Sequence, residues 1–159
     1  MITGLAHTAL RVADVDAAVA WYRDVLGLVV LSPPYRMEGD AITHDMGELV
    51  PAPVVVKAAI VGVDDGSDRV IEVIEYPAAV AGEPAPVDVT RLGYTHVALV
   101  CDDVSATRAE LEAKGVTFIV DGIADVAGLR TTWFADPWNN VFILLEKVRR
   151  PDQPYFRQY

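Results

Sequence analysis

The feature that most constrains the fold of this chain is an internal repeat. Residues 4–12, GLAHTALRV, align without a gap with residues 93–101, GYTHVALVC. A second match joins residues 70–75, VIEVIE, to residues 141–146, VFILLE. Because self-similarity of this kind marks one structural unit built twice, the repeat predicts the architecture before any single element is assigned.

Each copy begins with the same order of predicted elements. A strand of alternating residues is followed by an aspartate suited to a helix N-cap, Asp14 in the first copy and Asp103 in the second. Apolar residues then recur at helical spacing up to Gly27 and Gly115, which suit a left-handed helix end. A short strand, a loop and two further strands complete the copy. The sequence therefore predicts an α+β fold made of two βαβββ modules.

The repeat also predicts the domain organisation. We expect one domain over residues 1–159, with a linker that is rich in Ala, Pro and Val and lacks periodicity. Its parts are module one at 1–77, the linker at 78–91, module two at 92–148 and a C-terminal tail at 149–159. Short strands are expected at 28–31, 54–63 and 116–120, and a long loop at 32–53 is expected to act as a lid.

Composition excludes several classes of partner. Thirteen basic and twenty-three acidic residues give a formal net charge of -10, which repels nucleic acids and anionic membranes. The single cysteine, Cys101, cannot form an internal disulfide, and residues 1–4 do not resemble a secretory signal. We therefore expect a cytoplasmic protein that binds neither nucleic acid nor membrane.

The motifs resemble the vicinal oxygen chelate superfamily, which includes glyoxalase I, methylmalonyl-CoA epimerase, extradiol dioxygenases and the fosfomycin and bleomycin resistance proteins. The resemblance covers nearly the whole chain. It rests on residues 7–12 (HTALRV), 20–28 (AWYRDVLGL), 96–99 (HVAL) and 134–137 (FADP). It implies that the two modules form one open barrel-like cleft (glyoxalase-like fold), a small-molecule substrate with vicinal oxygens, and a homodimer. The fold hosts many reactions, so the resemblance does not select one.

The resemblance also implies a metal site. Similar proteins place up to four ligands on the first and last strands of the two modules, and the matching positions here are His7, Glu72, His96 and Ile143. Isoleucine is not a ligand, so three remain. Two imidazoles and one carboxylate form the facial triad that suits Fe(II) and also accepts Mn, Co, Ni or Zn.

Strand periodicity adds an independent reason to expect a cation at Glu72. Val70, Glu72 and Ile74 share one face of their strand, so the carboxylate lies between apolar neighbours. A buried carboxylate costs several kcal/mol unless it is paired or bound to a cation. A metal-free pocket with hydrogen-bonded core histidines is the alternative.

Other polar and aromatic residues have weaker assignments. His44 lies in the predicted lid, where it would serve as a catalytic proton-transfer group, although a solvated histidine is the alternative. Glu75 and Glu146 have the opposite strand parity to Glu72 and are interpreted as structural or surface carboxylates. Trp133 is expected to pack in the core or at a dimer seam.

Three functions remain open. The first is an isomerase, epimerase or lyase, in which a metal stabilises an enolate and Glu72 is both ligand and base. The second is a non-haem Fe(II) dioxygenase. The third is a metal-free protein that binds a drug or natural product, a possibility favoured by Ile143.

Overall fold

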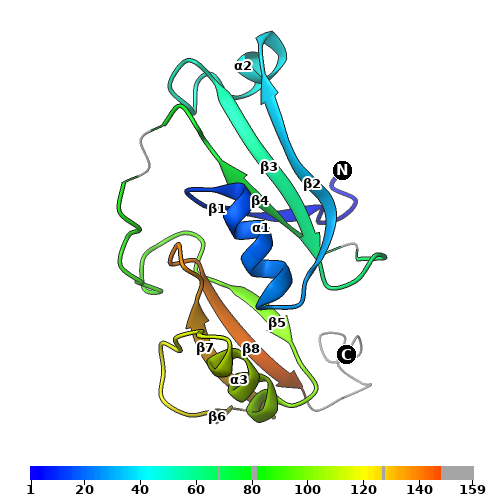
Figure 1. Ribbon diagram of the computed structural model, residues 1–159, viewed down its shortest axis with the longest axis vertical. Helices are drawn as coiled ribbons and strands as arrows, with labels where there is room; N and C mark the ends of the chain where they lie inside the picture. The colour runs from blue at the N-terminus through cyan, green and yellow to red at the C-terminus, as the bar shows by residue number, and fades with distance from the viewer. Residues whose placement is uncertain (68, 80–81, 127, 148–159) are drawn as a thin grey trace. The chain divides into compact units, whose positions relative to one another are not determined.

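The computed structural model describes residues 1–67, 69–79, 82–126 and 128–147 (Figure 1). The chain divides into two compact units, Met1–Glu83 and Pro84–Tyr159, and this division falls within the predicted linker at 78–91. The predicted tail at 149–159 lies outside the described residues. No helix among the described residues is long and apolar enough to cross a membrane.

The first unit contains a four-stranded mixed sheet with the strand order β1-β4-β3-β2. Strands β1 and β4 are parallel, and the other neighbours are antiparallel. Its elements are β1 (His7–Arg11), α1 (Val15–Asp24), β2 (Val29–Glu38), α2 (Asp40–Met46), β3 (Val55–Gly62) and β4 (Val70–Glu75).

The second unit repeats this topology in the strand order β5-β8-β7-β6, again with the first and last strands parallel. Its elements are β5 (Val97–Val100), α3 (Val104–Ala113), β6 (Ala124–Val126), β7 (Leu129–Ala135) and β8 (Val141–Lys147). The predicted α+β fold with two βαβββ modules is therefore confirmed.

Strand register makes the repeat exact at the level of single residues. In the first unit Ala9 pairs with Glu72, and in the second unit Ala98 pairs with Ile143. Residues paired on neighbouring strands point to the same face of a sheet. Glu72 and Ile143 are therefore structurally equivalent, as the sequence repeat predicted.

In each unit a core of apolar residues forms on one sheet face and the adjoining helix. In the first unit the buried residues of α1 recur at helical spacing, and alternate residues of the strands, which share one face, are buried as well. The buried helical residues are Val15, Ala18, Val19 and Tyr22, and the buried strand residues of matching parity include Leu10, Val73, Ala59 and Val61. The opposite face carries His7 and Glu72 in the first unit and His96 in the second.

The predicted lid loop at 32–53 is wrong. Residues 32–38 continue strand β2, and residues 40–46 form helix α2. Proline cannot donate a ladder hydrogen bond, but Pro33 and Pro34 fit in β2 because it is the edge strand, where one side needs no donor. Register irregularities between Val30 and Tyr35 accommodate the two prolines.

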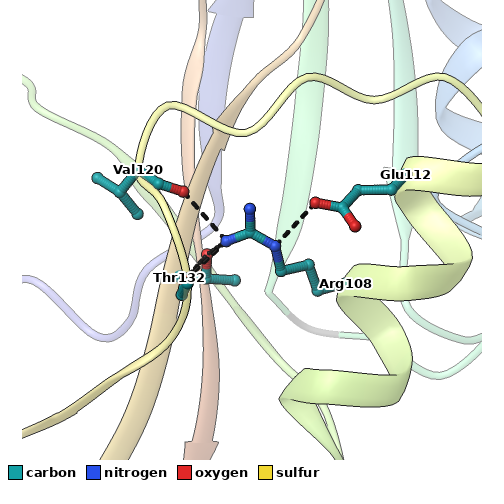
Figure 2. Close-up of polar contacts among 5 residues, drawn as sticks. Arg108, Glu112, Val120 and Thr132 are labelled. Carbon is teal, nitrogen blue, oxygen red and sulfur yellow. Dashed lines mark hydrogen bonds and ion pairs between the residues drawn. The ribbon is translucent and has the colours of Figure 1, made fainter.

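The predicted strand at 116–120 is also wrong. This segment makes only one isolated bridge, Phe118 to Phe134, and the second strand of the module is β6, a few residues later. Arg108 on α3 contacts this segment: its guanidinium donates to the carbonyl of Val120 (Figure 2) and to that of Gly122. The loop is thereby held toward the helix.

Arg108 is the centre of a polar network that spans three elements. It also donates to the Thr132 hydroxyl at 2.8 Å and to Glu112 at 2.9 Å (Figure 2). Its guanidinium carbon lies 4.4 Å from the centre of the Phe118 ring. Thr132 is fully buried. The side chain therefore fastens the loop to α3 and β7.

Replacing Arg108 with methionine is expected to lower the free energy of unfolding by about 1.5–3 kcal/mol, because hydrogen bonds to a charged group are lost. Urea denaturation followed by circular dichroism measures the change. Glu112→Ala is the matched control, since it removes only an exposed helical ion pair. Equal losses in the two variants would contradict a role for Arg108 in holding the loop.

Both predicted helix N-caps are confirmed. The Asp14 carboxylate accepts from the Ala17 amide, and the Asp103 carboxylate accepts from the amides of Ser105 and Ala106. The hydrogen bond from Ala106, followed by that from Ser105, lowers the pKa of Asp103 below its usual value.

The lowered pKa predicts a pH dependence of stability. A carboxylate whose pKa is lower in the folded chain stabilises it above the unfolded pKa of about 4, and this stabilisation is lost as pH falls through the folded pKa. Asp103→Asn keeps the acceptor oxygen but does not titrate. We expect wild type to lose stability relative to this variant as the pH falls from 6 to 3. Urea denaturation measures the free energy of unfolding of both proteins. A difference between them that stays constant with pH would be evidence against the cap.

Candidate functional site

The first unit brings two of the predicted site residues into contact. His7 lies at the start of β1 and Glu72 at the centre of the neighbouring strand β4, and the His7 Nε2 atom is 3.4 Å from the Glu72 Oε2 atom. The carboxylate pairs in register with Ala9 and Ile60, so its surroundings are apolar, and its side chain is 17% exposed. The imidazole is 46% exposed.

This geometry fits two ligands of one divalent ion. The His7 Nε2 and Glu72 Oε2 atoms, 3.4 Å apart, are close enough to bind the same ion. An imidazole nitrogen and a carboxylate oxygen are also a donor set that transition metals and zinc accept.

The pair by itself is an incomplete metal site. In the parts of the chain that the structure describes, no three His, Cys, Asp or Glu side chains come together closely enough to hold an ion. At least one further ligand is therefore needed.

The second unit places His96 just before β5, where two side chains contact its ring. The Thr95 hydroxyl lies 2.8 Å from the His96 Nδ1 atom. The Trp133 ring meets the imidazole edge to face, with centroids 4.7 Å apart and planes at 71°. Trp133 also pairs in register with Ile143.

These contacts were not predicted from the sequence. Trp133 was assigned to the core or to a dimer seam, whereas it is half-buried beside a candidate ligand. The alternation of side chains along the strands is a sequence signal for this contact, because Trp133, Ile143 and His96 share one face once the strand register is known. Ile143 is buried, at 8% exposure, where the first unit carries Glu72.

The structure places His44 on helix α2, away from the apolar contacts of that helix. Ile42 and Met46 pack against a buried cluster formed by Val50, Val54, Val56 and Ala58. His44 lies two positions from each of them and is exposed, so it is on the other side of the helix. A catalytic role for His44 remains a prediction.

Glu75 and Glu146 have structural roles, as their parity predicted. Glu75 Oε2 accepts from the Val15 amide at 3.0 Å, and Glu146 Oε2 accepts from the Val104 amide at 2.9 Å, so each carboxylate binds the first turn of its helix. Both acidic side chains thereby supply acceptors for otherwise unpaired helix donors.

A basic residue accompanies each of these carboxylates, and the sequence analysis missed both. Lys57 lies opposite Glu75 and contacts Asp16, while Arg130 lies opposite Glu146 and donates to it and to Ser105. The contact with Asp16 raises the pKa of Lys57. Each unit therefore contains an equivalent set of polar contacts that joins its helix to its sheet.

Comparison with known proteins agrees with this architecture. Protein YwbC of Bacillus subtilis (strain 168), described as uncharacterized, is 29% identical to the chain over 118 residues, which is 74% of this chain and 75% of that protein. The crystal structure of a glyoxalase family protein from Bacillus cereus matches with a TM-score of 0.75 at 18% identity, over 91% of this chain and 94% of that one.

Glyoxalase I of Leishmania major, described as trypanothione-dependent, matches with a TM-score of 0.62 at 20% identity, over 92% of this chain and 88% of that one. At these identities the two structural matches show the fold alone. The family model described as the Glyoxalase/Bleomycin resistance protein/Dioxygenase superfamily matches residues 4–144. With the duplicated βαβββ module and the equivalent positions of its two histidines, the chain belongs to this superfamily.

Proposed function

We propose that the protein is a metal-dependent enzyme acting on a small molecule with vicinal oxygens, and that its reaction is an isomerisation, an epimerisation or a lyase reaction. The contact between His7 and Glu72 is the observation that carries the proposal. Members of this superfamily typically use divalent metals and bind small-molecule substrates, which supports it further.

In this proposal His7, Glu72 and His96 hold the ion, which is Fe, Mn, Co, Ni or Zn. The ion supplies Lewis-acid stabilisation of negative charge that develops on a substrate oxygen. Glu72 has a second role as the base, taking a proton onto a carboxylate oxygen from the carbon next to the carbonyl group, so that the electron pair of the C–H bond moves toward the carbonyl oxygen. Ala9 and Ile60 are its partners on the neighbouring strands.

Two other functions are supported by particular residues. Two histidines and one carboxylate are the usual protein ligands of the iron in a non-haem Fe(II) dioxygenase. Ile143 and Trp133 give the second unit an apolar surface beside His96, which favours a metal-free protein that binds a drug or natural product. We further propose a cytoplasmic homodimer, a proposal that rests on the family resemblance and the single cysteine.

Elemental analysis of protein purified without chelator tests the proposal. We expect close to one metal per chain in wild type and loss of that metal in His7→Ala, Glu72→Ala and His96→Ala. His44→Ala is the matched control, since this histidine is exposed on α2 and is not a proposed ligand. A wild-type protein that contains no metal, and takes up none on reconstitution, would refute the metal-dependent functions.

The reaction class needs separate measurements. Oxygen uptake with iron and catechols would support the dioxygenase. Small-molecule binding that persists in chelator would support the metal-free binding protein. Proton exchange next to a substrate carbonyl, lost in Glu72→Gln, would support the isomerase or lyase.

A further inference from the structure

The two candidate histidine ligands are held in different ways. His7 contacts a carboxylate, Glu72, through its Nε2 atom. His96 has an isoleucine at the equivalent position and is instead contacted at Nδ1 by the Thr95 hydroxyl and along its ring by Trp133. The second unit therefore leaves the Nε2 atom of its histidine outside the Thr95 contact.

The repeat shows that this arrangement is specific to the second unit. The residue equivalent to Thr95 is Ala6, which has no hydroxyl. The residue equivalent to Trp133 is Ile60, because Ile60 pairs with Glu72 as Trp133 pairs with Ile143. Where the carboxylate is missing, a hydroxyl and an indole contact the imidazole instead.

We propose that Thr95 and Trp133 are positioning residues that orient the His96 ring, with Nδ1–H directed at the Thr95 hydroxyl and Nε2 left available to a metal ion. The assignment rests on the proposed metal-dependent function. In this proposal Nδ1–H donates a hydrogen bond to Thr95 Oγ1, which lies 2.8 Å away, and the edge-to-face contact with Trp133 restricts rotation of the imidazole.

The tautomer follows from the chemistry of a metal ligand. A neutral imidazole carries one proton, so a ring nitrogen that binds metal requires the proton to be on the other nitrogen. Histidine ligands almost always donate that second N–H to an oxygen acceptor, which sets the tautomer and the ring orientation. The hydroxyl of Thr95 lies 2.8 Å from Nδ1, and the proposal assigns it as that acceptor.

Nuclear magnetic resonance of the metal-free protein tests the tautomer directly. Long-range proton–nitrogen correlation spectra of protein with labelled histidine distinguish the two neutral forms at a pH where the ring is uncharged. We expect the Nδ1–H form at His96 in wild type, a mixture of forms in Thr95→Val and recovery in Thr95→Ser. The His7 signals provide an internal control and are expected not to change.

The opposite tautomer would overturn the proposal. If the Thr95 hydroxyl donates to Nδ1, His96 carries its proton on Nε2 and the wild-type spectrum shows the Nε2–H form. An unchanged tautomer in Thr95→Val would also overturn it, because the hydroxyl would then have no influence on the ring.

Metal affinity gives a second readout. Titration with Co²⁺ or Zn²⁺ is expected to show affinity about 10- to 100-fold weaker in Thr95→Val and Trp133→Leu, as for other groups that orient a ligand, and close to wild type in Thr95→Ser. Equal affinities in all four proteins would contradict the positioning role. Wild type that binds no metal would refute the proposed function, whereas the tautomer measurement tests the contact of Thr95 with His96 independently.

Discussion

Replacing Ile143 with glutamate is expected to make divalent metal bind at least about tenfold more tightly, since loss of even an outer-shell partner changes affinity about 10- to 100-fold. Ile143 is equivalent in register to Glu72, so the new carboxylate would take the fourth ligand position that the family resemblance implies. Isothermal titration with Co²⁺ or Zn²⁺ measures the change.

The same variant is expected to be less stable without metal. Ile143 is buried, and an unpaired buried carboxylate costs several kcal/mol. A metal concentration of about 1,000 times the dissociation constant would raise the free energy of unfolding by about 4 kcal/mol. Ile143→Gln is the matched control, because it has similar size and polarity without the charge; stabilisation of both variants by metal to the same extent would contradict ligation by the carboxylate.

Replacing Phe134 with alanine is expected to lower the free energy of unfolding by about 3–5 kcal/mol, through lost burial and the cavity that remains. Phe134 is fully buried, its ring stacks on that of Phe142 at 5.1 Å, and the Phe118 ring lies 5.6 Å away. Urea denaturation followed by circular dichroism measures the loss.

Phe134→Leu is the control for this prediction, because leucine keeps most of the buried volume and should cost clearly less. Val61 is the equivalent residue in the first unit, since it pairs with Ile71 as Phe134 pairs with Phe142. Val61→Ala is expected to cost less than Phe134→Ala, because fewer buried atoms are removed. Similar losses in Phe134→Ala and Phe134→Leu would show that the cavity term is absent.

The repeat was predictable because it rests on alternation and helix caps, which are local properties of a chain. Asp14 and Asp103 mark helix starts through a hydrogen bond to amides three residues away, and strand parity assigns Glu72 to one face and Glu75 to the other. The equivalence of Glu72 with Ile143 followed from the same alignment and agrees with the observed register.

Errors arose where the environment of a segment, rather than its own residues, determined the structure. Pro33 and Pro34 are compatible with β2 only because that strand lies at a sheet edge. Residues 116–120 form an isolated bridge in place of a strand, and Arg108, on a preceding helix, binds the carbonyls of Val120 and Gly122 beside it.

The candidate site also combines features that the sequence determines locally with contacts that only the tertiary structure determines. The sequence by itself determined the fold, because strand alternation and helix caps are local properties that the repeat shows twice. The assignment of His7, Glu72 and His96 as ligands came from the family resemblance and remains a prediction. Only the tertiary structure decided that His7 contacts Glu72 and that Thr95 and Trp133 contact His96. His7 and Glu72, like His96 and Trp133, are far apart in sequence, and strand pairing, which brings them together, depends on the whole sheet.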